Sequence, residues 1–341
     1  MFIYFHITKD LIYIPIFVFI NLIIKWIIEY SKIKYEFMSH ICDVCLIIFY
    51  LLEKYLIKDN NNDYYIKINK IPYKMILLLI SSIILLCIDN FSYFYGKIKI
   101  DDFEDLIITI FFLILIELIF FNQTFYRHQI LSIIVIFIFY VYFLVKKYIN
   151  VSLKLYYVID LLQFYCYSFS LHIIKYINTQ YFISIYLLGS IHGIFLLIQD
   201  LIQKSFLSFP EIKLLNILII ILFFFILLVN NFLYYKIIEK LGPIYLFMSE
   251  SISYFLIDLV KNSSFEFIPI CLIVIISCLI YLEILELNFC SLNKNTKKNI
   301  ENRAQQEIIS ELNISKSIYD ILEQSNSSFK SNNDSSENQF Q

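Results

Sequence analysis

Ionisable side chains occur inside some of the most apolar stretches of this chain, where a charge is expensive. On insertion scales such a group costs roughly 2.5–3.5 kcal/mol at the centre of a membrane, so it needs a partner, a wet cavity or a place near the interface. Glu250 is the clearest case, because it lies near the middle of the apolar stretch 243–260, between Ser249 and Ser251. We expect Glu250 to couple a proton or to contact a polar solute.

Further polar groups could line the same pathway. Asp160 and Gln163 are spaced to share one face of a helix. His192 lies in Gly189-Ser190-Ile191-His192-Gly193, a segment that holds two of the four glycines. Small residues four apart are typical of a close helix crossing, and the imidazole is also a candidate proton relay because histidine titrates near physiological pH. Both interpretations of His192 stay open.

Three segments recur at an offset of 141 residues, which indicates an internal duplication. The pairs are Ile33-Lys34-Tyr35 with Ile174-Lys175-Tyr176, Ile88-Asp89-Asn90-Phe91 with Val229-Asn230-Asn231-Phe232, and Leu115-Ile116-Glu117-Leu118-Ile119 with Leu256-Ile257-Asp258-Leu259-Val260. Matches between Ile and Leu carry little weight in so biased a composition. The polar matches are rarer, and all of them share one register.

The repeat gives these polar residues paired roles. Glu117 and Asp258 are equivalent and are gate candidates, with headgroup contact at a helix end as the alternative. Asp89 and Asn230 are further gate candidates. Asn90 and Asn231 could contact a solute, or the whole amide set could hydrogen-bond helix to helix. Lys34 and Lys175 would attract anions at the two mouths.

Ten apolar stretches are long enough to position these residues as membrane-spanning helices, for which about 20 residues are needed. The chain is 60% hydrophobic and 16% charged, with a mean hydropathy of +0.72, so we expect a bilayer to be its solvent. The expected spans are 11–30, 38–57, 73–95, 104–122, 128–146, 153–174, 180–202, 214–235, 243–260 and 267–286.

An odd number of spans in each copy makes the second copy enter the membrane from the opposite side. We therefore expect an all-α membrane protein built as a 5+5 inverted repeat. Residues 1–147 would form the first five-helix repeat, 148–290 the second, and 291–341 a polar tail with a possible amphipathic helix over 299–324. The tail is equally compatible with a solvated stalk.

The chain resembles the drug/metabolite transporter superfamily, which includes EamA-type and nucleotide-sugar transporters. Locally the resemblance rests on 105–145, where Phe120-Phe121-Asn122-Gln123-Thr124-Phe125-Tyr126-Arg127 is similar to the family's short basic and aromatic turn between its fourth and fifth spans. The glycines usual in the fifth and tenth spans of the family are absent. The resemblance implies ten helices, a central cavity and alternating access.

We therefore expect a multi-pass transporter for a small polar or anionic metabolite, with a nucleotide sugar among the candidates. A noncatalytic membrane scaffold or trafficking receptor is the alternative, and a membrane-embedded enzyme is a weaker one, because no nucleophile with a base is recognisable. We expect both termini in the cytoplasm, an unspecified organelle, partners limited to the solute and lipid with a homodimer left open, and no cofactor.

Other functions are disfavoured by charge and cysteine placement. The net charge is −2 and the basic residues are scattered, which disfavours nucleic-acid binding. Cys42-Asp43-Val44-Cys45 has the spacing of a metal site but lies in an expected span without a second ligand pair, so we expect no metal. Gly242-Pro243 is typical of a turn followed by a helix start.

Overall fold

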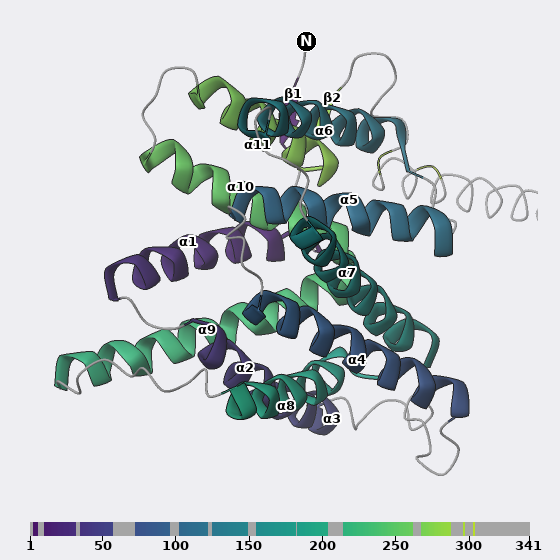
Figure 1. Ribbon diagram of the computed structural model, residues 1–341, viewed down its shortest axis with the longest axis vertical. Helices are drawn as coiled ribbons and strands as arrows, with labels where there is room; N and C mark the ends of the chain where they lie inside the picture. The colour runs from purple at the N-terminus through teal and green to yellow at the C-terminus, as the bar shows by residue number, and fades with distance from the viewer. Residues whose placement is uncertain are drawn as a thin grey trace, which may run out of the picture.

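The computed structural model describes residues 3–5, 10–31, 35–56, 72–95, 102–121, 125–148, 155–181, 183–203, 214–261, 267–287, 296 and 303. These residues are almost entirely helical (Figure 1). In chain order the elements are β1 (Ile3–Phe5), α1 (Tyr13–Ser31), α2 (Tyr35–Cys45), α3 (Ile47–Leu56), α4 (Tyr73–Tyr95), α5 (Asp102–Phe120), α6 (Arg127–Tyr148), α7 (Leu155–Tyr181), α8 (Ile185–Gln203), α9 (Leu214–Lys240), α10 (Pro243–Lys261), α11 (Phe267–Tyr281) and β2 (Leu285–Leu287).

Each apolar stretch expected to span a membrane contains a helix, and several boundaries follow from local chemistry. Helix α9 ends where the Leu241 and Gly242 amides both donate to the Ile237 carbonyl, at 2.8 and 3.0 Å. Gly242 has a φ of +118°, which glycine adopts without strain, and α10 begins at the next residue, Pro243. The expected turn and helix start are confirmed.

The stretch 38–57 differs from the expectation of one continuous span. It divides into α2 and α3 at Leu46, whose amide bonds the Asp43 carbonyl at 3.1 Å, a tighter turn than the α-helix. Leu46 is fully buried. No proline or glycine marks this position, so the sequence carried no signal for the break.

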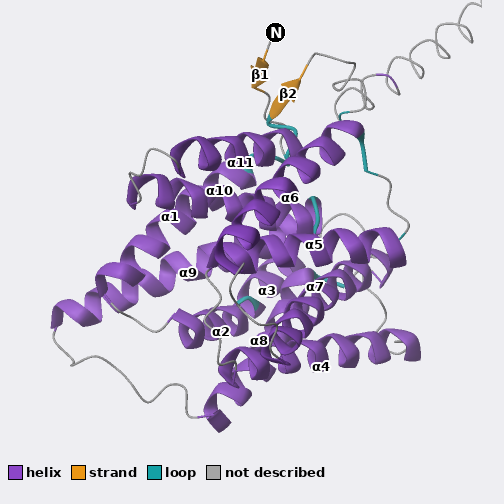
Figure 2. Ribbon diagram, turned by 45° about the horizontal axis from the view of Figure 1, so that its top comes forward, coloured by secondary structure: helices purple, strands orange, loops and turns teal. Residues whose placement is uncertain are grey.

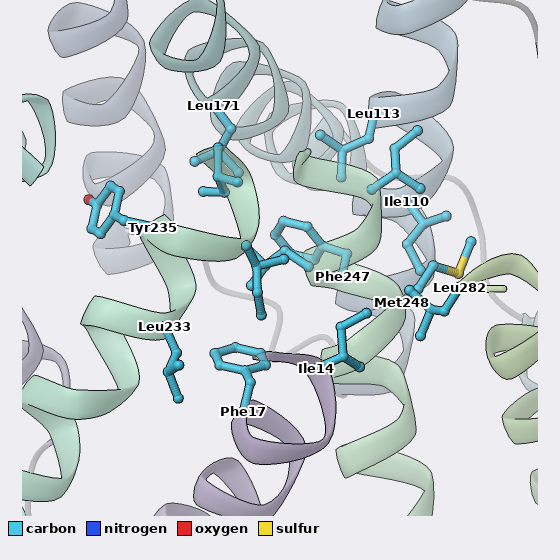
Figure 3. Close-up of a cluster of buried hydrophobic side chains, with 14 of the residues drawn as sticks. Ile14, Phe17, Ile110, Leu113, Leu171, Leu233, Tyr235, Phe247, Met248 and Leu282 are labelled. Carbon is cyan, nitrogen blue, oxygen red and sulfur yellow. The ribbon is translucent and has the colours of Figure 1, made fainter. Parts of the chain in front are cut away.

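The helices are arranged on two sides of a central column (Figure 1). Helices α1 and α9 pack together on one side, and α4 and α7 pack together on the other. The column consists of three pairs of helices, and the two helices of each pair are in contact. The pairs are α2 with α8, α5 with α10, and α6 with α11. Helix α10 lies at the centre of the apolar core, where Phe247 and Met248 meet side chains from α1, α5 and α9 (Figure 3).

Two glycines of α8 let neighbouring helices approach closely, as the small-residue segment predicted. A Cβ on Gly193 would lie 2.6 Å from Asp43 Cβ and 2.8 Å from the backbone nitrogen of Val44, both on α2. A Cβ on Gly189 would lie 2.6 Å from the ring of Tyr235 on α9. The α2–α8 crossing is therefore a backbone-to-backbone contact that only glycine permits.

The outer surfaces of the helices carry large apolar side chains, while many polar ones are buried. Trp26, Phe19 and Leu222 are 66%, 63% and 59% exposed, whereas His192 and Ser168 are 2% and 0% exposed. This distribution is the reverse of that in a water-soluble protein. Among the described residues three helical segments are long and apolar enough to cross a membrane, within α8, α9 and α10, and shorter apolar helices accompany them.

A short strand pair joins the segments that flank the helices. Strands β1 and β2 are antiparallel, with Tyr4 opposite Glu286, and they lie at the end of the bundle next to α11 (Figure 2). The residues just before α1 and those just after α11 are therefore neighbours.

Replacing Gly193 with leucine should destabilise the protein, because the new side chain has no space between α8 and the α2 backbone. We expect a loss of about 1–3 kcal/mol from overpacking, measured as a lower thermal midpoint of the purified protein in detergent. Ile194→Leu is the matched control, since Ile194 is the next residue and is 42% exposed. Equal midpoints for the two variants would contradict the tight crossing.

Candidate functional site

The structure divides the buried polar residues into three clusters. We name them after their central acid. The Glu250 cluster lies between α1, α9 and α10, the Asp43 cluster between α2, α8 and α9, and the Glu117 cluster between α5 and α7. The common site expected from the sequence is thus spread over several helix junctions.

Glu250 occupies an unusual position in its helix. Residues 246–249 and 251–253 of α10 are all buried, whereas Glu250 as a residue is partly exposed, although its carboxyl group is surrounded by protein. Lys25 of α1 acts electrostatically on it, and Lys25 Nζ lies 4.4 Å from the centre of the Tyr254 ring. Among the described residues no hydrogen-bond donor holds the Glu250 carboxylate. The carboxylate is thus available to a ligand or water.

Helices α1 and α9 run antiparallel beside Glu250, and this fixes what lies at its level. The first half of α1 packs with the last turns of α9 in the main core, while Ile24 and Ile27 pack with Phe223 and Leu227 in a separate cluster. One turn further along this interface the alignment brings Asn21 to the level of Asn230.

These two amides offer complementary hydrogen-bonding atoms. Asn21 Nδ2 and Asn230 Oδ1 are buried, and neither has a partner among the described residues. Leaving such a group unpaired costs about 1–3 kcal/mol. Tyr234, one turn after Asn230, exchanges a 2.7 Å hydrogen bond with Tyr167 and is coupled electrostatically to Glu250. Helices α1, α9 and α10 thus each contribute one polar residue to the region of this junction, namely Asn21, Asn230 and Glu250.

The Asp43 cluster is a hydrogen-bonded network that joins α2 to α8 and α9. Asn231 Nδ2 donates to Asp43 Oδ1 at 2.9 Å and to the Ser39 carbonyl at 3.1 Å. His40 Nδ1 lies 2.6 Å from Asp200 Oδ2. Asn231 therefore makes helix-to-helix hydrogen bonds, the structural alternative raised from its sequence.

His192 faces α4 rather than this network. Its Nε2 lies 2.9 Å from Ser82 Oγ, which also reaches the Leu79 carbonyl at 2.8 Å, while its Nδ1 is buried with no partner among the described residues. The close crossing at the adjacent Gly193 is real, and the imidazole is additionally hydrogen-bonded.

The Glu117 cluster connects α5 with α7. Glu117 is 4% exposed, and its Oε1 lies 3.2 Å from His172 Nε2, also buried. His172 Nδ1 lies 2.9 Å from the Ser168 carbonyl. Lys175, one turn further along α7, acts electrostatically on Glu117 and places its Nζ beside Gly242, at the carbonyl end of α9. Glu117 therefore pairs within the protein, and the headgroup alternative does not describe it.

A third acid–histidine contact, after His40–Asp200 and His172–Glu117, lies at the end of the bundle with the strand pair. His128 Nε2, at the start of α6, is 3.2 Å from Glu283 Oε1, which follows α11. The contact is close enough for an ion pair, although its angles are not those of a hydrogen bond. Glu283 has a left-handed φ of +59°, uncommon for this residue type.

The remaining predicted residues are only partly placed. Gln163 on α7 and Asp258 on α10 are half-buried, and Asp258 acts electrostatically on Cys271 of α11. Asp89 and Asn90 lie on α4 and Asp160 lies on α7, but their side chains are outside the described part of the chain, as is Lys34 altogether. The tail segment 299–324, apart from Arg303, and the turn at 122–124 are also outside it.

Several residues of these clusters were not singled out from the sequence. Asn21, Lys25 and His172 are isolated polar residues in apolar stretches, and none matches a residue of the same kind in the 141-residue register, where they fall on Leu162, Cys166 and Ser31. One signal for His172 existed, because it lies three residues before Lys175 and so shares its helical face.

No protein-family model matches this chain, and no curated protein matches it either.

Proposed function

We propose that the protein is a multi-pass membrane transporter of ten spans, which moves a small polar or anionic metabolite by alternating access. The observation that carries this proposal is Glu250, a partly exposed acidic residue of the central helix α10 whose neighbours in sequence, 246–249 and 251–253, are all buried. A polar group kept accessible inside an apolar protein is typical of a solute or ion pathway. The unpaired amides Asn21 and Asn230 would hydrogen-bond the solute beside it.

The inverted repeat is supported by the pattern of helix contacts. Under the 141-residue offset α1 corresponds to α7, α2 with α3 to α8, α4 to α9, α5 to α10, and α6 to α11. The contacts α4–α7, α5–α7, α4–α8 and α5–α6 then have as counterparts α9–α1, α10–α1, α9–α2 and α10–α11, all of which occur. The pairs α2–α8, α5–α10 and α6–α11 are their own counterparts. Among the described residues several weaker packings of the second half lack counterparts of similar extent, namely α9–α10, α8–α9, α7–α8, α7–α10 and α7–α9.

Helix directions are also those that ten alternating spans would have. The fourth and sixth spans, α5 and α7, should run parallel. Phe112 of α5 packs near Tyr165 of α7, and Phe121, just beyond α5, packs near Tyr176, so residue numbers increase in the same direction along both helices. The fifth and tenth should run antiparallel, and the start of α6 contacts the residues after α11 through His128 and Glu283. These directions favour spans that cross one after another. Both termini would then share one side, which we assign to the cytoplasm.

Inverted topology makes a direct prediction for labelling. The α1–α2 and α7–α8 connections are equivalent by repeat, so they should face opposite sides of the membrane. In a background with the seven cysteines replaced, Lys34→Cys and Thr179→Cys should differ. One should react with a membrane-impermeant maleimide on sealed vesicles, and the other only after permeabilisation. Labelling of both from the same side would reject the inverted repeat.

Transport itself is tested in liposomes containing the purified protein and a panel of amino acids, sugar phosphates and nucleotide sugars. Glu250→Gln should reduce uptake of the active solute about tenfold, because an amide oxygen accepts hydrogen bonds from the hydroxyl or ammonium groups of a solute less strongly than a carboxylate does. Glu239→Gln is the matched control, since Glu239 pairs with Lys236 at 2.8 Å near the end of α9. It should leave uptake unchanged.

Two outcomes of the liposome assay would count against the proposal. Absence of uptake for every solute by the unsubstituted protein would favour the scaffold or receptor alternative. Equal uptake by the Glu250→Gln and Glu239→Gln variants would remove Glu250 from the pathway.

A further inference from the structure

The contact between Glu117 and His172 requires a proton to lie between them. A carbonyl oxygen only accepts hydrogen bonds, so His172 Nδ1 must carry a hydrogen to reach the Ser168 carbonyl at 2.9 Å. In a neutral imidazole Nε2 would then be an acceptor. An acceptor nitrogen cannot bond an ionised carboxylate, yet Nε2 lies 3.2 Å from Glu117 Oε1. The hydrogen bond forms only if Nε2 or Oε1 holds one additional proton.

The surroundings keep this proton between two helices. Glu117 and His172 are 4% and 3% exposed, so bulk water cannot replace either partner. Among the described residues, Glu117 interacts electrostatically with Lys175 of α7, Tyr245 of α10 and Tyr281 of α11. Two further titratable groups are connected to Glu117 indirectly. Glu283 interacts electrostatically with both tyrosines, and His128 contacts Glu283. A second added proton would give this buried pair a net positive charge, which burial disfavours, so the pair alternates between one added proton and none.

The two partners belong to different halves of the proposed repeat, α5 to the first and α7 to the second. Separation of these halves would hydrate both side chains. A hydrated carboxylate and a hydrated imidazole are ordinarily free of this proton near neutral pH. The closed arrangement therefore binds one more proton than the open one.

We propose that the Glu117–His172 pair is a proton-binding site that locks α5 to α7, so that the two halves close on proton uptake and open on proton release. This inference rests on the proposed transport function and supplies its coupling ion. It also separates the roles, with the proton on Glu117 and His172 and the solute at Glu250. Proton uptake forms the Nε2–H···Oε1 bond, and release returns the proton to water at the opened interface.

The test measures helix separation, so it needs no knowledge of the solute. Nitroxide labels at Leu118 on α5 and Thr179 on α7, both exposed, report the α5–α7 distance by pulsed electron paramagnetic resonance in nanodiscs. For a single linked proton, the ratio of short to long distances should rise by up to about tenfold per pH unit as the pH falls. We would scan from about pH 8 to pH 5, where histidine ordinarily titrates.

The Glu117→Gln variant tests the additional proton separately from the hydrogen bond between α5 and α7. The glutamine amide can donate to a neutral Nε2, so the contact persists without an additional proton, and we expect the distance ratio to become independent of pH. His172→Gln should give the same loss and serves if the first variant does not fold. Glu283→Gln, which alters the other buried acid–histidine contact, should keep the pH dependence.

Distances that do not change with pH in the unsubstituted protein would overturn the inference. So would an unchanged pH dependence in Glu117→Gln. Neither result bears on whether solute crosses the membrane, and a failure of uptake in liposomes would leave the pH-linked distance change intact, so the two proposals fail separately.

Discussion

The structure depends on one constraint, which is that its buried polar groups have only each other as partners. Exposed helix faces are apolar, so the polar side chains of α2, α5, α7, α8, α9 and α10 turn inward. Burying a polar group is tolerated only when it is hydrogen-bonded. Asn231 with Asp43, His172 with Glu117, and His40 with Asp200 each meet this requirement across two helices. Among the described residues Asn21 and Asn230 depart from it, as do atoms of His192, Tyr186 and Gln199 elsewhere, and it is the presence of Glu250 beside α1 and α9 that led us to propose a ligand at the junction of α1, α9 and α10.

The positions of the helices were largely predictable, because hydropathy and chain length act locally. The stretch 73–95 matches α4 in both bounds, and the Gly242-Pro243 turn separates α9 from α10 as its residue types indicate. The break at Leu46 was not predictable, since no helix-breaking residue marks it; it follows directly on the residues of α2 that lie against Gly193 of α8. Membrane crossing by all ten stretches and the inverted repeat stay predictions, which the contact pattern favours.

The polar clusters were much harder to predict, because their partners are distant in the chain. Glu117 stood out by its repeat partner, but nothing in the sequence connects it with His172, 55 residues away. Asn231 and Asp43 are separated by 188 residues, and Asn21 had no distinguishing neighbour at all. In a chain so rich in Ile, Leu and Phe, side-chain pairing is decided by which helices pack together. Tertiary geometry alone carries that information.

The strand pair has a mechanical consequence for any motion between the two halves. Strand β1 leads into α1 and β2 follows α11, so the backbone hydrogen bonds between them join the first half directly to the second. In the proposed motion of the two halves this junction would be a pivot, and displacement between the halves would increase with distance from it. The junction of α2 and α8, at the opposite end of the bundle in Figure 1, sits at the far end of the lever arm.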